Sequence, residues 1–259
     1  MANITFKKIV GTTFFLCASI FLRMVLNAKE RNVMRHHLIV EALSSTRRQL
    51  KVFFISDIHR RKIDEKLLKK IDKDIDLVII GGDLAEKNVP LSRINRNVQK
   101  LSQLGQVFYV WGNNDREVGE ETIRQIIGQH DGIILENKNM PIHSHSSWGI
   151  CGTDDPSCLK LDVEQALENI EQYKNVLFVS HQPVVWEEVE RYYHPTLMLA
   201  GHTHGGQIRL GKFGISEKGS FESVGGRGKL ISNGYGTTTL PLRLGARPEC
   251  HIITISYTE

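Results

Sequence analysis

The apolar positions of this chain alternate between short continuous runs and stripes with helical spacing. Runs such as Val52–Ile55 are too short for a helix and stop at glycine or polar residues, so they predict buried strands. We expect strands over residues 52–55, 77–80, 106–111, 132–135, 148–152, 196–200 and 251–256, and in the run NVLFV that begins at residue 175. Stripes of apolar residues opposite charged ones predict helices over residues 63–71, 92–104, 120–128 and 162–173. Because strands and helices alternate at first and strands dominate the last quarter, the pattern indicates an α/β fold with a mixed sheet system.

The longest apolar stretch runs from Ile9 to Leu26 and contains a single charged residue, Arg23. Its length is near the lower limit for crossing a bilayer, and basic residues flank it on both sides. Three interpretations stay open. We favour a retained, single-pass membrane anchor, because no small-x-small cleavage site follows; a cleaved secretion signal comes next, and the lack of a polar face disfavours a helix packed on the domain. Basic residues after the stretch outnumber Lys7 and Lys8 before it, which favours the cytoplasmic side for the rest of the chain.

We therefore divide the chain into an N-terminal anchor and connector, residues 1–48, and one domain, residues 49–259. A short apolar piece at 37–43 is a candidate edge strand in the connector. With 259 residues, 41% of them hydrophobic, the chain is long enough to bury a large core in that domain. The net charge of +4 is small and is not gathered on one basic face, so we expect no nucleic-acid partner. The four cysteines form no CxxC pair, which suits a reducing compartment.

Side chains typical of metal ligands follow several of the predicted strands directly. Asp57 and His59 end the first strand, and a spacing of two residues on extended backbone points both side chains the same way, toward one cation. The corresponding positions after later strands hold Asp83, Asn113, Asn114, His181, His202 and His204. Because open α/β sheets bind their ligands outside the carboxyl ends of the strands, we expect these side chains to share one site.

In sequence order these residues form the blocks DIH, GGD, GNND, SHQP and GHTH. This order resembles the five-block signature of the calcineurin-like metallophosphoesterases, and the resemblance covers the chain from Lys51 to the C-terminus. The ending, with GGQIRL and SNGYGTTTLPLRLGARPE, is similar to the bacterial branch of that family that often carries an N-terminal membrane or export segment. The resemblance implies a four-layer αββα sandwich of the metallo-dependent phosphatase type, which hydrolyses a phosphomonoester, phosphodiester or pyrophosphate.

The resemblance also implies a centre of two divalent metal ions bridged by Asp83. One ion would be held by Asp57, His59 and His204, and the other by Asn113, His181 and His202. Two adjacent cations can clamp the attacking and leaving oxygens of a phosphoryl displacement, and a water between them becomes hydroxide near neutral pH. This mixture of imidazoles and carboxylates suits Mn²⁺, Fe²⁺, Zn²⁺ or Co²⁺ better than Mg²⁺ or Ca²⁺, and manganese is our first expectation.

The chain departs from the family pattern at Asn114, where most members have a histidine that contacts the phosphate and is often assigned as the proton donor. Asn114 and Asp83 are the positions that we expect to act in catalysis. An amide donates a hydrogen bond but transfers no proton at useful pH, so good leaving groups should be favoured over alkyl monoesters. The alternative function is a metal-supported binding module of the same fold with weak or no catalysis. A tethered enzyme would meet a phosphorylated small molecule or a lipid-linked substrate at the membrane surface.

Other polar residues near the blocks carry weaker signals. We interpret Asp115 as a turn carboxylate and favour a turn before Pro156 for Asp154 and Asp155, over a role in orienting a ligand histidine. Arg243 and Arg247 have two open interpretations, contacts with phosphate oxygens or surface ion pairs.

Overall fold

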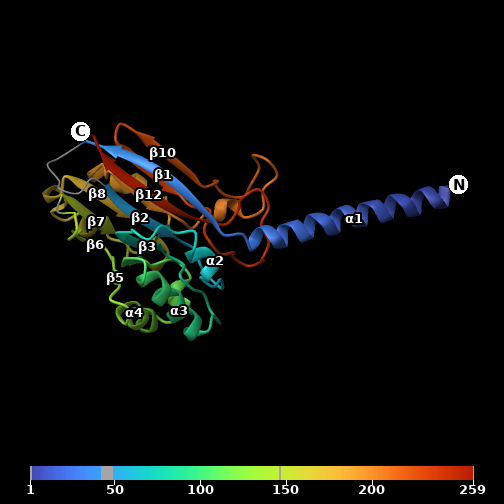
Figure 1. The fold of residues 1–259 in the computed structure, drawn as a ribbon, viewed down its shortest axis with the longest axis horizontal. Helices are drawn as coiled ribbons and strands as arrows, with labels where there is room; N and C mark the ends of the chain where they lie inside the picture. The colour runs from blue at the N-terminus through green and yellow to red at the C-terminus, as the bar shows by residue number, and fades with distance from the viewer. Residues whose placement is uncertain (1, 42–48, 146, 259) are drawn as a thin grey trace.

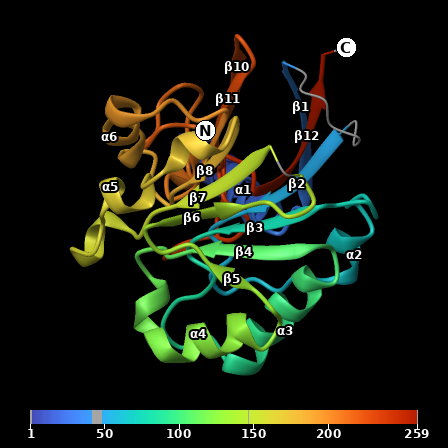
Figure 2. The same ribbon diagram turned by 90° about the vertical axis from the view of Figure 1, so that its left-hand side faces the viewer.

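The computed structural model describes residues 2–41, 49–145 and 147–258. Most of the described chain folds into two sheets that lie face to face (Figures 1 and 2). The first sheet contains β1 (Asn32–Val40), β2 (Gln49–Ile55), β3 (Leu77–Gly81), β4 (Gln106–Val110), β5 (Ile133–Ile134) and β12 (Glu249–Tyr257). The second contains β6 (Lys138–Pro141), β7 (Trp148–Gly152), β8 (Asn175–Val179), β9 (Leu197–Ala200), β10 (Ser220–Val224) and β11 (Arg227–Ile231).

Both sheets are mixed, as the sequence predicts. The first has the order β1-β12-β2-β3-β4-β5, in which β2 to β5 run parallel and β12 is parallel to β1 but antiparallel to β2. The second has the order β10-β11-β9-β8-β7-β6, a parallel centre with an antiparallel strand at each edge. The parallel strands β2, β3 and β4 of one sheet and β8 and β9 of the other therefore carry the predicted site residues at their carboxyl ends.

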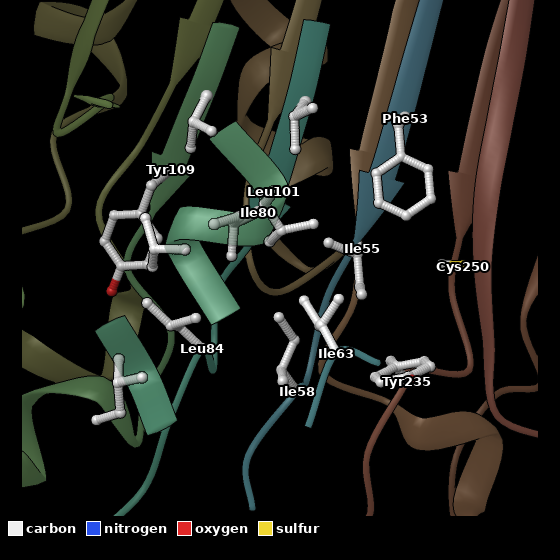
Figure 3. Close-up of a cluster of buried hydrophobic side chains, with 14 of the residues drawn as sticks. Phe53, Ile55, Ile58, Ile63, Ile80, Leu84, Leu101, Tyr109, Tyr235 and Cys250 are labelled. Carbon is white, nitrogen blue, oxygen red and sulfur yellow. The ribbon is translucent and has the colours of Figure 1, made fainter. Parts of the chain in front are cut away.

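Helices cover the outer face of each sheet. The first sheet is covered by α2 (Glu65–Leu68), α3 (Leu91–Ser102) and α4 (Glu120–Gly128), and the second by α5 (Val163–Ala166) and α6 (Val185–Tyr192) (Figure 2). Alternate residues of one strand serve different layers: Phe53 and Ile55 pack under the helices, whereas Val52 and Phe54 pack between the sheets. Figure 3 shows the first of these clusters, which includes Phe53, Ile80 and Leu101.

A third buried cluster lies between the second sheet and its helices, with Phe178 of β8 against Trp186 of α6. The order helix, sheet, sheet, helix confirms the predicted four-layer αββα sandwich.

Two predicted helices are shorter than their apolar stripes. Only α2 forms within 63–71, although Ile63, Leu67 and Ile71 are all buried as the stripe requires. Within 162–173 the chain forms α5 and then a separate 3₁₀ turn, η3 (Ile170–Gln172), because Asn169 between them has left-handed backbone (φ 56°). The stripes therefore report burial correctly and overstate helix length.

The N-terminal stretch forms one long helix, α1 (Ala2–Ala28), that extends away from the sheets (Figure 1). Its segment Val10–Ala28 is 19 residues long with a mean hydropathy of 1.6. An 18-residue stretch within this segment contains no buried residue. Such a helix could be a membrane span or a signal sequence. The side chains of Lys7 and Lys8, which we used to predict orientation, lie outside the described part of the structure.

The connector is only partly separate from the sheets. Its strand β1 forms the edge of the first sheet, as expected, but it covers residues 32–40, whereas we predicted 37–43. Three residues separate β1 from the end of α1. Residues 42–48, the rest of the connector, lie outside the described residues. The domain boundary between residues 48 and 49 stays a prediction. Strand β1 lies on the N-terminal side of this boundary, although it belongs to the first sheet.

Candidate metal centre

The site lies where the carboxyl ends of both sheets meet. Asp57 and His59 follow β2, Asp83 follows β3 and Asn113 follows β4, all in the first sheet. The second sheet supplies His181 after β8 and, after β9, His202 and His204. The loops of two layers thus bring together seven side chains that span almost 150 positions of the sequence.

One half of the site groups Asp57, His59 and His204, all of them buried. The Nε2 atoms of His59 and His204 lie 3.1 Å apart, and Nε2 of His204 lies 3.4 Å from Oδ1 of Asp57. Nε2 of His59 is also 3.6 Å from Oδ2 of Asp83. These are the residues that the family resemblance assigns to one metal position.

The other half groups Asn113, His181 and His202. Oδ1 of Asn113 lies 3.1 Å from Nε2 of His181 and 3.0 Å from Nδ1 of His202. Nε2 of His181 is 3.5 Å from Oδ2 of Asp83, so the same oxygen of Asp83 faces both halves. The ligand atoms of Asp57, Asp83 and His181 all lie within 4.8 Å of one another, which is close enough for a binuclear centre.

The hydrogen bonds around His181 show why this site suits a cation. Its Nδ1 donates to the carbonyl oxygen of Gly81 (2.9 Å), so a neutral ring keeps its lone pair at Nε2. That lone pair faces Oδ1 of Asn113 and a carboxylate oxygen of Asp83, which are acceptors as well. Three acceptors that converge at 3.1 to 3.5 Å need positive charge between them. The spacing fits ligands about 2.1 Å from a shared ion.

The pKa values follow the same electrostatic pattern. Burial lowers the pKa of His204 to about 4 and also lowers that of His202, so both rings are neutral at neutral pH, the form that binds metals. Burial opposes a charged His181 too, but the carboxylates of Asp83 and Asp57 outweigh it and raise its pKa to about 10. Without a metal, His181 holds a proton at the position where the site requires a cation.

The backbone of the predicted ligands is strained. Five of them have φ between 49° and 68°, in the left-handed region: Asp57, His59, Asp83, His202 and His204. Left-handed backbone is uncommon outside glycine and tends to cluster at functional sites. Our geometric reason for pairing Asp57 with His59 is therefore wrong, because β2 ends at Ile55 and neither residue is extended. Both side chains nevertheless point into one cluster.

Glycines let the ligand loops approach one another closely. A Cβ atom on Gly112 would lie 2.2 Å from the backbone nitrogen of Asp83 and 2.3 Å from its Oδ1. A Cβ on Gly82, which has φ 82°, would lie 2.5 Å from Nδ1 of His181. Residues with side chains at these positions would displace the carboxylate and the imidazole.

We expect Gly112→Ala to weaken Mn²⁺ binding at least about tenfold, because the added methyl group must push Asp83 out of place. Metal titration followed by elemental analysis of the dialysed protein measures this effect. Gly128→Ala is the matched control, since a Cβ at Gly128 meets nothing within 4 Å. Equal manganese affinity in the two variants would contradict the close approach of the Gly112 loop to Asp83.

Asn114 faces the bridging carboxylate. Its Nδ2 donates to Oδ2 of Asp83 (2.7 Å), and its backbone N–H donates to Oδ1 of the same residue (2.9 Å). Asp115 accepts from the backbone N–H groups of Ala85 (3.0 Å) and Gly112 (2.8 Å) and so joins two ligand loops, in agreement with its interpretation as a turn carboxylate. Burial, together with the charge of Asp83, raises the pKa of Asp115 to about 7.

Two residues beside the ligands have positions that the sequence did not predict. Oε2 of Glu86 lies 3.0 Å from Nδ1 of His59, although the two atoms form no hydrogen bond in this geometry. Arg243 is fully buried, and its guanidinium donates to the carbonyl oxygens of His204 (3.0 Å) and Gly236 (2.6 Å) and lies 3.1 Å from Nδ1 of His204. Arg243 therefore fits neither expectation, since it supports His204 from behind and forms no surface ion pair.

The remaining weaker signals are mostly structural. Arg247 lies 3.5 Å from Glu30 in a surface ion pair. The carboxylate of Asp154 accepts hydrogen bonds from both terminal nitrogens of Arg116 (2.9 and 2.7 Å). Asp155 accepts from the backbone N–H of Ser157 (2.9 Å) in the turn that we favoured, and Gln182 beside His181 also donates to it.

Comparison with known proteins is consistent with this site. The family model described as calcineurin-like phosphoesterase matches residues 50–206. The chain is 40% identical to the uncharacterized protein YpbG of Bacillus subtilis (strain 168), over 97% of this chain and 98% of that protein. It is 28% identical to the phosphodiesterase YaeI of Escherichia coli (strain K12), over 79% and 82% of the two chains.

A solved structure has the same fold. The 5'-nucleotidase precursor from Thermus thermophilus superposes with a TM-score of 0.50 at 11% identity. The match covers 81% of this chain and 55% of the nucleotidase, so this chain spans about half of that protein.

Proposed function

Because the chain belongs to the calcineurin-like phosphoesterase family, we propose that this phosphate ester hydrolase uses two divalent metal ions bridged by Asp83. The observation that carries the proposal is the position of Asp83 Oδ2, which faces His59 in one half of the site and His181 in the other. Asp57, His59 and His204 would hold one ion, and Asn113, His181 and His202 the other.

The family binds divalent metals, and the buried Asp and His groups of this chain could hold them. When bound, such ions polarise the phosphoryl group and lower the pKa of a bound water. The chain supplies the rest: the carbonyl group of Gly81 orients the imidazole of His181, Glu86 lies beside that of His59, and Asn114 holds the Asp83 carboxylate. Manganese is our proposed metal, because mixed imidazole, amide and carboxylate ligands suit it, and Fe²⁺, Zn²⁺ and Co²⁺ are the competitors.

The substrate class is a phosphorylated molecule, and we propose a phosphodiester or pyrophosphate with a good leaving group. Asn114 has no proton to transfer, so the leaving group must depart without help from this position. The E. coli relative YaeI is named a phosphodiesterase, which supports the diester. A lipid-linked substrate gains support from α1, whose Met24 accepts a hydrogen bond (3.1 Å) from the backbone N–H of Arg243, directly behind His204.

The experiment that tests this function compares an aryl monoester, an aryl diester and a UDP-linked lipid as substrates, with and without added Mn²⁺. We expect metal-dependent turnover, fastest for the diester or the diphosphate. Absence of turnover for all three, with two manganese ions bound per chain, would instead favour the second function, a metal-supported binding module. Asn114 is the feature that favours that module, since it replaces the usual proton donor.

Asn114→His should raise hydrolysis of an alkyl phosphomonoester by about a hundredfold, because a positioned general acid contributes that much or more. The ratio of monoester to aryl diester kcat/KM measures the effect independently of enzyme concentration. Asn114→Gln, which keeps an amide, is the control and should leave the ratio unchanged. If Asn114→His changed kcat/KM by the same factor for both substrates, the result would argue against a missing proton donor.

We further propose that α1 is retained as a membrane anchor and that the sheets lie on the cytoplasmic side. The exposed apolar surface of α1 and the basic residues that follow it, among them Lys29 and Arg35, support this orientation. Protease digestion of intact cells, compared with permeabilised cells, tests the side. The N-terminal sequence of the mature protein tests retention.

A further inference from the structure

A large cavity of about 1190 Å³ lies between α1 and the rest of the protein. One wall is formed by the last two turns of α1, and the other by β1 and the loops that surround β10 and β12. Residues that face it from the two sides include Ile20, Arg23, Asn27, Leu210, Lys218 and Arg247. This cavity is separate from the predicted metal ligands, none of which lines it.

The cavity is strongly cationic. Six basic residues line it, namely Arg23, Arg31, Arg35, Lys70, Lys218 and Arg247, against one acid, Glu249. Oε1 of Glu249 already accepts hydrogen bonds from the backbone and side-chain nitrogens of Asn233 (2.9 and 2.8 Å). Arg31, Arg35 and Arg247 are paired with Asp64, Asp72 and Glu30, respectively. Arg23 and Lys218 form no ion pair within 4 Å with any residue that the structure describes, so they carry the uncompensated positive charge of the cavity. Such a cavity favours an anionic occupant.

Apolar side chains project from the loops next to this cavity. On the loop over residues 207–219, Leu210 is 73%, Phe213 70% and Ile215 92% exposed, and Leu240 on the following loop is 52% exposed. Both loops lie beside the domain end of α1 (Figure 1). Since Leu210 and Ile20 line the same cavity, the loop is continuous with the exposed apolar surface of α1. Contiguous exposed apolar surface marks an interaction site.

The position of the loop along α1 indicates what covers it. A 19-residue helix is about 28 Å long, close to the thickness of a bilayer core. Ile20 and Arg23 lie in the last turns of this span, where acyl chains give way to headgroups and an arginine extends its guanidinium to the lipid phosphates. Leu210 lines the same cavity and therefore lies at this boundary. Basic residues beside the same loop lie where lipid phosphates would lie.

We propose that this face docks on an anionic phospholipid bilayer. The apolar residues Leu210, Phe213 and Ile215 enter the boundary between headgroups and acyl chains, and lipid phosphates occupy the cationic cavity beside Arg23 and Lys218. The inference rests on the proposed membrane anchor and goes beyond it, because a single helix alone would leave the sheets free to tilt. Through Arg243, which contacts both Met24 and His204, docking holds the metal centre at the lipid surface.

The test uses full-length protein reconstituted into phosphatidylglycerol vesicles that contain lipids spin-labelled near the headgroup. Cys17→Ser and Cys158→Ser remove the accessible thiols, since Cys151 and Cys250 are buried. A fluorophore is then attached at Ile215→Cys, or at Val224→Cys as the matched control. Val224 is 82% exposed on β10, at the turn to β11. We expect most of the fluorescence to be lost at position 215 and little at position 224.

Charge is tested on the same labelled protein. Arg23→Gln combined with Lys218→Gln, or vesicles of phosphatidylcholine alone, should reduce the quenching at position 215 while the protein still floats with the vesicles. Flotation with no more quenching at 215 than at 224 would overturn docking but leave the anchor intact. Quenching that is insensitive to both charge changes would overturn the anionic site. Failure to float would overturn the anchor and the docking together.

Discussion

Asp83→Asn should lower kcat/KM for an aryl phosphodiester by at least about a thousandfold, because one oxygen of Asp83 serves both halves of the centre. Asparagine keeps the size of the side chain but removes the negative charge that, in our proposal, holds two cations together. Bound manganese should fall from two ions to one or fewer per chain, measured by elemental analysis of the same preparation.

Asp162→Asn is the matched control for that change. Asp162 caps α5 by accepting from the backbone N–H of Gln165 (2.8 Å), away from the site, and asparagine caps helices equally well. Its activity and metal content should equal those of the unchanged protein. If Asp83→Asn still bound two manganese ions and turned over normally, a bridging role for Asp83 would be ruled out.

Arg243→Met should reduce the free energy of unfolding by about 3 kcal/mol or more, because each buried acceptor left without its hydrogen bond costs about 1 to 3 kcal/mol. Arg243 is fully buried, and methionine would leave the carbonyl oxygens of His204, Gly236 and Ala246 without this donor. Because His204 loses its support, we expect activity to fall as well. Urea unfolding in detergent, followed by tryptophan fluorescence, measures the stability.

Arg247→Met provides the comparison four residues away. The side chain of Arg247 is 63% exposed and lies 3.5 Å from Glu30, and changes to such exposed pairs usually stay within about 0.5 kcal/mol. The two arginines flank the same LRLGAR segment, so a similar loss in both variants would show that the segment, not the buried guanidinium, determines the effect.

The fold follows from the sequence where burial alone determines it. Runs such as Leu77–Ile80 become central parallel strands, because a continuous apolar run must be buried on both faces and the centre of the sheet provides that burial. Helix length is less predictable, since the stripe over 162–173 is equally compatible with one helix or with two turns broken at Asn169. Pairing partners such as β1 and β12 have no local signal, because they are set by the whole sheet.

The candidate site was visible in the sequence because its side chains are confined to strand ends. The two halves that the family resemblance implies are the two groups whose ligand atoms lie 3.0 to 3.6 Å apart, although the ligand roles themselves stay predictions. Arg243 could not be assigned, since a buried arginine that binds carbonyl groups has the same sequence appearance as a surface one. Glu86, three residues after Asp83, offers a weak signal that spacing alone does not distinguish from a turn.

The order of strands in the first sheet has a consequence for biosynthesis. β12 lies between β1 and β2, yet it leaves the ribosome after every other described strand. At about 5 to 20 residues per second, translation needs on the order of ten seconds or more to proceed from β2 to β12. During that interval the facing edges of β1 and β2 have no partner in the nascent chain, so synthesis of the C-terminal strand determines when the sheet can close.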